Sequence, residues 1–368
     1  RMLVAEASET FKAEVLGVDN TMPGEQPVVT FKISNPETGE TWDIKNDPAF
    51  NDPGARLAVG IAWDTDEFIN IGNQGDNASS VQTQDIASFV DNGDGSYSAT
   101  MPVAIPDGSE APGIAATGSG AATVEGHPVL DVDDEEEGAE TIPLTNAHAF
   151  FSIDEPDGSA VARRQAVELD NCLACHGKLS LHGGNRNDSI ESCVTCHNPR
   201  NTDKRVREVA SDPPTDGKDE ESIHFATMVH GIHAAAIREN PLEVVGFRGF
   251  TTYRYTEEAV HYPGDLSNCT ACHTDSSYTL PLADGVLGIT VDTGADRADP
   301  ADDVVVTPTA AVCSSCHDDQ VAKSHMTSNG GNFATSQAAI DSGEVVEECS
   351  VCHGSGRNSD VSKVHNPR

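Results

Sequence analysis

The motif Cys-x-x-Cys-His occurs five times in this chain and uses all ten cysteines, and no other feature restricts the fold as strongly. It is the attachment signature of c-type haem, in which two thiols bond to the porphyrin and the histidine binds the iron. We therefore predict five covalently bound haem c groups. The attaching cysteines are Cys172, Cys175, Cys193, Cys196, Cys269, Cys272, Cys313, Cys316, Cys349 and Cys352. The proximal iron ligands are His176, His197, His273, His317 and His353.

Other uses of paired cysteines fit this pattern less well. A single Cys-x-x-Cys serves as a redox dithiol or as half of a zinc site, and paired cysteines also build disulfide frameworks. None of these uses needs a histidine directly after the second cysteine. Five such histidines, with no cysteine left over, favour haem over all three.

The chain is strongly acidic, with 60 Asp and Glu residues against 22 Lys and Arg and a formal net charge of -38. Haem propionates add further negative charge. Nucleic acids and anionic membrane surfaces are therefore poor partners and are not expected. Self-repulsion keeps such a surface soluble, and salt weakens that repulsion.

The sequence holds no run of about 18 apolar residues, so we expect no membrane span. Haem c is attached outside the cytoplasm, so we expect the protein to be exported and a signal peptide to have been removed before Arg1. The predicted location is extracellular or on the outer cell surface.

Residues 1–165 lack cysteine and place apolar side chains at every second position. This alternation is typical of strands with one buried face, and turns rich in Gly, Pro, Asn and Asp separate the stretches. We predict an all-β domain here, a sandwich or a split, Greek-key barrel. The alternating positions are Phe11, Ala13 and Val15; Val29, Phe31 and Ile33; Leu57, Val59, Ile61 and Trp63; Tyr97, Ala99, Met101, Val103 and Ile105; and Ala147, Ala149, Phe151 and Ile153.

Three features of this domain are given no redox role. The acidic run at 131–140 is predicted to be a solvated loop, because its spacing does not match an EF-hand, and calcium binding is the alternative. His127 and His148 are predicted to be surface or packing residues.

From residue 166 to residue 368 the character changes, because cysteine and histidine appear and the apolar periodicity fades. With five haems in this stretch, the porphyrins themselves form the hydrophobic core. We predict a pentahaem domain over 166–368, with short helices at the motifs, loops between them and little regular structure.

Five irons need five further ligands if histidine fills both axial positions of each. Seven histidines outside the motifs lie in the haem region. His230 and His233 are three residues apart in a plausible helix, so they project from one side of it. Axial ligands of one iron come from opposite faces of the porphyrin. We therefore predict that these two histidines bind two different haems that lie close together.

The remaining histidines differ in their distance from a motif. His182 follows His176 by only six residues, which span about 20 Å when fully extended. His182 therefore reaches a neighbouring haem more readily than the far face of its own, and the same holds for His325 after His317. The sequence does not indicate which haem His365 binds.

Four further side chains complete the set of candidates. His224 and His261 are predicted to be surplus. Met228 and Met326 are the less favoured alternative ligands, because each stands beside a better-placed histidine.

Taken in order, these motifs resemble the OmcA/MtrC family of outer-surface multihaem cytochromes. The matching pieces are CLACHG followed by His182-Gly-Gly, CVTCHNP, MVHGIH, YPGDLSNCTACH, CHDDQVAKSHM, and CSVCHG followed by Val364-His365. The resemblance covers nearly the whole haem region, whereas residues 1–165 match only in architecture. It is a resemblance to one half of these decahaem proteins, a split β-barrel domain followed by a pentahaem domain.

The resemblance implies the distal ligands, and these are His182, His230, His233, His325 and His365. The second barrel, the second pentahaem domain and the barrel disulfide of the family have no counterpart in this sequence.

The predicted function is extracellular electron transfer through closely spaced bis-histidine haems, and not enzymatic catalysis. The expected partners are other multihaem cytochromes, extracellular electron acceptors, or further copies of the chain joined head to tail as a conductive filament. One alternative is a soluble or surface-bound terminal reductase of metals or humic substances. A second is a pentahaem oxyanion reductase with an open iron, which is disfavoured because every motif is complete and ligand candidates exceed the need.

Overall fold

The computed structural model of the chain describes residues 4–70, 81–110, 113–132, 139–155 and 158–365. These residues form two compact units, and each is described by itself. The first unit contains the described residues up to 163 together with 173–196, and the second contains 164–172 and the described residues from 197 onward. The acidic run at 131–140 lies largely outside the described residues.

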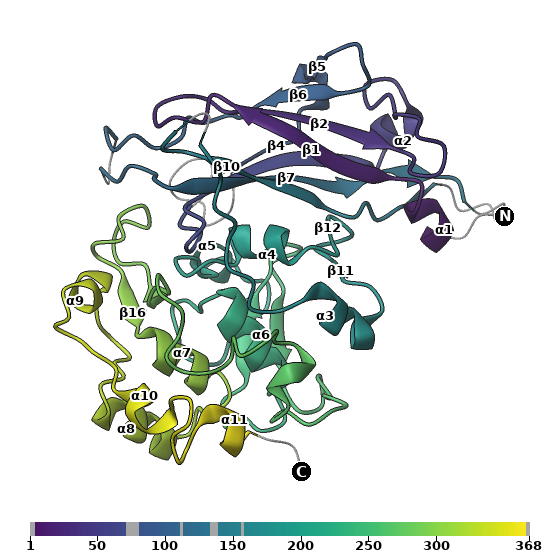
Figure 1. Ribbon diagram of the computed structural model, residues 1–368. Coiled ribbons are helices and arrows are strands. Elements are labelled where there is room, and N and C mark those ends of the chain that lie inside the picture. The colour runs from purple at the N-terminus through teal and green to yellow at the C-terminus, as the bar shows by residue number, and fades with distance from the viewer. Residues whose placement is uncertain (1–3, 71–80, 111–112, 133–138, 156–157, 366–368) are drawn as a thin grey trace. The chain divides into compact units, whose positions relative to one another are not determined.

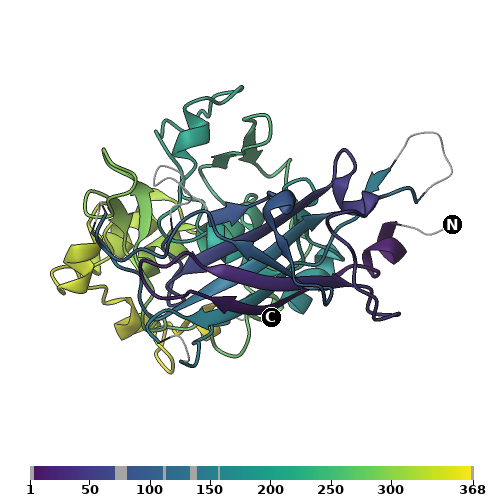
Figure 2. The same cartoon turned by 90° about the horizontal axis from the view of Figure 1, so that it is seen from above.

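The first unit is built on two four-stranded antiparallel sheets, with the orders β1-β2-β6-β5 and β10-β7-β3-β4 (Figure 1). The strands are β1 (Lys12–Asp19), β2 (Val28–Ser34), β3 (Arg56–Trp63), β4 (Val81–Thr83), β5 (Val90–Asp91), β6 (Tyr97–Thr100), β7 (Ser119–His127) and β10 (Ala147–Ser152). Seen from above in Figure 2, the long strands of the two sheets run in roughly the same direction, as in an aligned sandwich. A bridge between Lys12 and Thr145 joins the sheets along one side.

The alternating apolar residues form the core of this sandwich. Phe31 and Ile33 of β2 and Leu57 and Ile61 of β3 are all almost completely buried. The ring of Phe31 meets that of Phe89 edge to face, with 5.7 Å between the ring centroids. Burying one such side chain contributes about 1.5–3 kcal/mol relative to leaving it exposed, so the sandwich has a sufficient core of its own.

The alternation does not predict the central strand β7, whose residues are mostly small and are all buried. A Cβ atom at Gly120 would lie 2.4 Å from the ring of Phe151, which belongs to the neighbouring strand β10. Glycine is therefore required there for close packing.

Several short elements complete the first unit. They are α1 (Val4–Ser8), α2 (Pro48–Asn51), the 3-10 turn η1 (Ile86–Ser88), β8 (Val129–Leu130), β9 (Glu140–Thr141), β11 (Ser180–Leu181), β12 (Arg186–Asn187) and α4 (Ile190–Cys196). Helix α3 (Leu169–His176) begins in the second unit and ends in the first.

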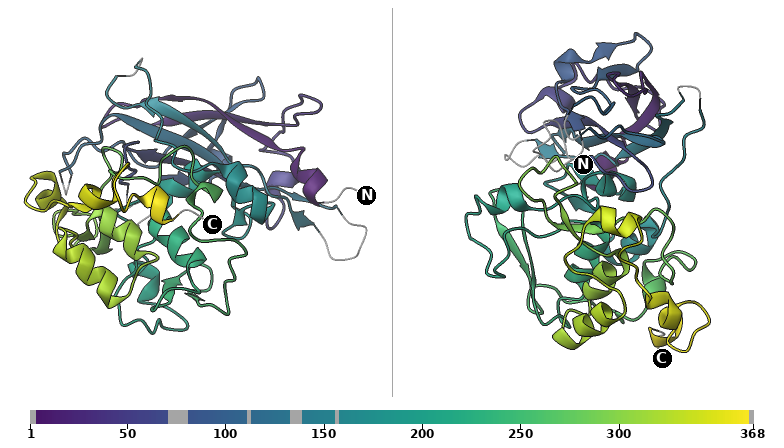
Figure 3. Two further views of the ribbon diagram at one scale, coloured as in Figure 1. Left: turned by 60° about the horizontal axis from the view of Figure 1, so that its bottom comes forward. Right: turned by 90° about the vertical axis from the view of Figure 1, so that its left-hand side faces the viewer.

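The second unit consists of short helices and two-stranded hairpins separated by loops, in green to yellow in Figure 3. Its elements are α5 (Lys204–Arg207), α6 (Phe225–His233), β13 (Leu242–Val245), β14 (Thr252–Tyr255), η2 (Cys269–Ala271), β15 (Ile289–Asp292), β16 (Val304–Val306), α7 (Pro308–Ser314), α8 (Gln320–Ser328), α9 (Gln337–Asp341), α10 (Cys349–His353) and α11 (Val361–Val364). The main apolar cluster among its described residues is small and is centred on Ile289, Val306, Ala310, Ala311 and Met326.

The predicted fold class is confirmed, since a β-sandwich is followed by a region of short helices and loops. The domain boundary at residues 165 and 166 stays a prediction. In the part of the chain that the structure describes, no helix combines the length and the apolar character needed to cross a membrane.

Candidate haem centres

Each Cys-x-x-Cys pair lies on or beside a short helical turn, in α3, α4, η2, α7 and α10 respectively. Side chains three residues apart in a helix lie on the same side, so both sulfurs of a motif can bond to one porphyrin. None of the ten cysteines, all of which lie among the described residues, takes part in a disulfide bond.

The fourth pair lies in apolar surroundings. Burial raises the pKa of the Cys313 thiol to about 12 and that of the Cys316 thiol to about 11. Such a site disfavours a thiolate, whereas a thioether has no proton to lose. The two sulfurs therefore fit covalent attachment to haem.

Three pairs of histidine rings lie at nearly the same separation, and each pair contains one motif histidine. The ring centroids are 6.0 Å apart for His230 and His273, 5.9 Å for His317 and His365, and 6.1 Å for His325 and His353. Imidazole nitrogens bind metals at about 2.0 Å, so two imidazoles on opposite sides of one metal ion have centroids about 6 Å apart. Each pair thus has the spacing of two axial ligands, and the residues present fit a haem.

The last two motifs exchange their histidine partners. His325 follows His317 in the chain, yet its ring lies beside His353. His365 follows His353, yet its ring lies beside His317. Glu347, just before the fifth motif, also accepts two N–H bonds at 2.8 and 2.7 Å from the first turn of α7, which leads into the fourth motif. These two motifs are therefore tied to each other reciprocally.

In several of these histidines the second ring nitrogen, Nδ1, is held by an oxygen atom. A carbonyl oxygen only accepts hydrogen bonds, so Nδ1 carries the proton and Nε2 is left to bind a metal. The contacts are His197 to Ile223 O at 2.7 Å, His233 to Val229 O at 2.9 Å, His353 to Ser359 O at 2.9 Å and His365 to Val361 O at 3.3 Å.

His273 is oriented by a hydroxyl group instead of a carbonyl. Its Nδ1 lies 3.1 Å from Oγ of Ser277, and this hydroxyl donates to the carbonyl of Ala166 at 2.6 Å. The hydroxyl oxygen is thus available to accept the Nδ1 proton.

Helix α6 carries both His230 and His233, and their rings have different neighbours. His230 lies beside His273, whereas His233 meets the ring of Tyr262 edge to face, with 5.6 Å between centroids. Burial lowers the pKa of His230 to about 4, and the neighbouring His273 and His233 add to this effect. His230 is therefore neutral near pH 7, which is the form that binds a metal.

His182 lies in a tight loop of the first unit, between β11 and β12. His182, Gly183 and Gly184 have φ angles of 53°, 72° and 87°, all in the left-handed region that favours glycine. The two glycines allow the turn that places His182 at its start.

The sandwich anchors the end of this loop. Asn187 is 1% exposed, and its amide donates to the carbonyls of Gly126 and Leu144 at 3.2 and 3.1 Å. Arg186 forms an ion pair with Glu125 of β7, whose side chain is 2% exposed. The sequence does not predict these contacts, because the partners are about 40 to 60 residues apart and follow no pattern.

The histidines predicted to be surplus, surface or packing residues have varied surroundings. His127 in β7 and His224, directly before α6, are buried, whereas His261 is exposed. His148 in β10 has its Nδ1 4.0 Å from the carboxylate of Glu191. Of the two alternative methionine ligands, Met326 belongs to the apolar cluster of the second unit and Met228 is half-buried.

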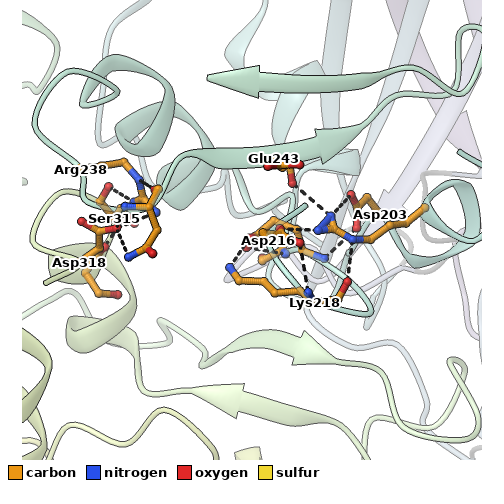
Figure 4. Close-up of polar contacts among 12 residues, drawn as sticks. Asp203, Asp216, Lys218, Arg238, Glu243, Ser315 and Asp318 are labelled. Carbon is orange, nitrogen blue, oxygen red and sulfur yellow. Dashed lines mark hydrogen bonds and ion pairs between the residues drawn. The ribbon is translucent and has the colours of Figure 1, made fainter. Parts of the chain in front are cut away.

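Two buried ionic clusters flank β13 in the second unit (Figure 4). In one, Arg207 pairs with Asp203 at 3.4 Å and with Asp216. In the other, Arg238 pairs with Asp318 at 3.6 Å, directly after the fourth motif. The sequence gives no signal for either cluster beyond the charges themselves.

Residues 164–366 match a family model described as outer membrane cytochrome MtrC/MtrF-like, domains II/IV. The chain belongs to this family. The predicted resemblance to OmcA/MtrC cytochromes is therefore confirmed.

Two solved structures share the fold of this MtrC/MtrF-like chain. The crystal structure of MtrC from Shewanella baltica OS185 is 16% identical, with a TM-score of 0.56, over 95% of this chain and 52% of that one. The crystal structure of the outer membrane decahaem cytochrome OmcA is 19% identical, with a TM-score of 0.51, over 98% of this chain and 49% of that one. The chain thus spans about half the length of these structures, and comparison with curated proteins gives no match.

Proposed function

We propose that this chain transfers electrons outside the cell through five covalently bound haem c groups, each with two axial histidines. Bound haem supplies one-electron redox chemistry at its iron. The chain's own part is to fix the positions of the haems, to keep both axial sites occupied and to tune the potentials. The protein is in this account an electron carrier and not an enzyme.

The observation that carries the proposal is the set of three histidine pairs with centroids about 6 Å apart. An iron with both axial positions filled by protein has no site for substrate. Function then depends on haem spacing and potential, and not on chemistry at a bound ligand.

The remaining ligands follow from a count. His176 and His197 are the proximal histidines that belong to none of these three pairs. Among the predicted distal ligands, His182 and His233 remain for them. The loop geometry of His182 and the Nδ1–H bond of His233 support both as ligands.

The reciprocal exchange between the fourth and fifth motifs supports close haem spacing. His317 of the fourth motif lies beside His365, which follows the fifth motif. His353 of the fifth motif lies beside His325, which follows the fourth. Two haems held in this way cannot separate without loss of an axial ligand, so an electron path between them is built into the fold.

The proposed partners are other multihaem cytochromes, extracellular electron acceptors such as metal oxides or humic substances, or further copies of this chain. Head-to-tail copies would form a conductive filament. A net charge of -38 opposes contact between copies, so association should rise with salt. Light scattering and electron microscopy across a salt series test this part. Monomers at every salt and protein concentration would leave a shuttle or a terminal reductase.

The central proposal is tested by mass spectrometry and low-temperature electron paramagnetic resonance (EPR). The intact exported protein should carry five haem additions, and all irons should give low-spin signals. A stoichiometric high-spin haem would contradict the ligand count and would favour the oxyanion reductase with an open iron.

A further inference from the structure

Arg238 and Asp318 form a buried ion pair beside the fourth motif (Figure 4). Their side chains are 11% and 4% exposed, and the charged atoms are 3.6 Å apart. Arg238 also donates to the carbonyl of Ser314 at 3.4 Å and to that of Ser315. These two serines are the residues between the attaching cysteines of the motif. The guanidinium group therefore lies against the attachment loop itself.

Asp318 holds the other end of the motif, because it directly follows the proximal His317. Its carboxylate accepts the backbone N–H groups of Glu239 and Asn240, each at 2.9 Å, and the side-chain amide of Asn240 at 3.1 Å. Arg238 donates through Nε to the carbonyl of Asn240 at 3.0 Å. The segment 238–240 is therefore bonded to the motif both between its two cysteines and directly after its histidine.

This segment follows helix α6 and ties it to the fourth motif. The same helix carries His230, whose ring lies beside His273 of the third motif. At its other end, Phe225 donates its N–H to the carbonyl of His197 in the second motif at 2.9 Å. One nine-residue helix thus contacts the second and third motifs, and Arg238, in the segment after the helix, links it with Asp318 to the fourth.

The two charges also act directly on the attachment site. Arg238 is bonded to the two serines between the attaching cysteines, and Asp318 directly follows the iron ligand His317. A buried positive charge near a haem disfavours the ferric state and raises the reduction potential, and a buried negative charge does the opposite. The pair therefore applies two opposed effects to one haem.

We propose that Arg238 and Asp318 are positioning residues for the haem attached at Cys313 and Cys316, and that their opposed charges set its reduction potential. The proposal rests on the proposed function, since it requires a haem at this motif. The planar guanidinium suits this place because it contacts three carbonyls and a carboxylate at once, which an ammonium group does not.

The test is a redox titration of the full holoprotein followed by EPR, for wild type, R238Q, D318N and the double variant R238Q/D318N. R238Q should shift the equilibrium of one haem about tenfold toward the oxidised form, which is about 59 mV for one electron. D318N should shift the same haem in the opposite direction. The double variant should return close to the wild-type potential, because both charges are gone.

Two further variants distinguish the effects of charge and of side-chain geometry from a general loss of stability. R238K keeps the positive charge but loses the planar guanidinium that bonds to several acceptors. The potential of this haem should therefore stay near the wild-type value, while its EPR line shape changes. R207Q is the matched control. The Arg207 side chain is 3% exposed against 11% for Arg238, and it bonds to carboxylates and to the carbonyls of Lys218 and Glu243, none of which belongs to a motif. R207Q should lower stability and leave all five potentials unchanged.

The proposal is overturned if R238Q and D318N shift the potential in the same direction, if all haems shift equally, or if R207Q reproduces the effect. If the wild type has five low-spin haems but no variant changes a reduction potential, this inference is wrong and the proposed function stands. Wild type without a haem at the fourth motif would remove the proposed function as well.

Discussion

The candidate ligands are oriented one residue at a time, by the atom that each Nδ1 proton meets. His233 and His365 donate to the carbonyl four residues earlier, in or beside their own helix. His197 and His353 donate to carbonyls in following loops. Because each contact also fixes the rotation of the ring, local backbone geometry sets the plane of His365 and of His353, one imidazole in each of two pairs.

This predicts distinct EPR signals. The planes of the paired rings meet at 18° for His230 and His273, 52° for His317 and His365, and 83° for His325 and His353. Nearly parallel imidazoles give rhombic low-spin signals, and nearly perpendicular ones give strongly anisotropic signals. The spectrum of the oxidised protein should therefore contain both kinds.

Single variants assign these signals. Replacing His325 by Met should remove a strongly anisotropic component, whereas replacing His230 by Met should remove a rhombic one. One uniform class of low-spin haem in the wild type would contradict the ring geometry.

Among the elements, the loop between β11 and β12 depends most clearly on distant partners. It carries His182, yet its anchor is the buried Glu125 on β7, which Arg186 and Arg56 both contact. Burial raises the pKa of Glu125, and the two guanidinium groups act against that rise. The sandwich therefore supports a loop that bears a predicted iron ligand.

We predict that Arg186→Gln lowers the free energy of unfolding of the first unit by about 3 kcal/mol, the lower end of the range for breaking a buried ion pair, because Arg56 remains. Denaturant unfolding followed by circular dichroism measures this. The control is Lys32→Gln, which removes a pair between side chains that are 33% and 47% exposed and should cost at most about 1 kcal/mol. Equal effects of the two variants would show that the loop is not anchored through Glu125.

The elements also show what a sequence can predict. Strands β1, β2, β3, β6 and β10 follow from apolar alternation in the sequence, although β3 is buried along almost its whole length. Strand β7 does not follow, since its small residues are buried on both faces. The motif cysteines are readable because covalent attachment requires fixed spacing, whereas Arg238 and Asp318 are 80 positions apart and only the fold brings them together.

At the scale of the whole molecule, the two units bury apolar side chains very unequally. The core of the first includes Phe31, Leu57, Ile61, Met101 and Ile142, and these are part of a much larger set than the cluster of the second. A domain needs a core to offset the loss of chain entropy on folding. In the second unit we expect the porphyrins to provide it.

The chain produced without haem attachment should therefore keep the first unit folded and lose the second. Limited proteolysis with mass spectrometry should yield a resistant fragment that contains the sandwich, while cleavage sites spread over 197–365. The holoprotein treated in parallel is the control and should resist over both regions. A haem-free chain that resists equally throughout would show that the second unit folds on its own protein contacts.

The bonds that join α6 and the segment after it to the motifs have a consequence for the stepwise reduction of the oxidised protein. Helix α6 is bonded to the second motif and carries a histidine beside the third, and the segment after it is bonded to the fourth, so we expect haems at these motifs to keep their spacing when their charges change. Adding an electron to one haem should then make reduction of its neighbours less favourable, because the haems do not move apart. The sites should therefore titrate as a coupled set. The redox titration curve of the protein should be broader than the sum of five independent centres. The protein could then accept electrons over a wide range of potential.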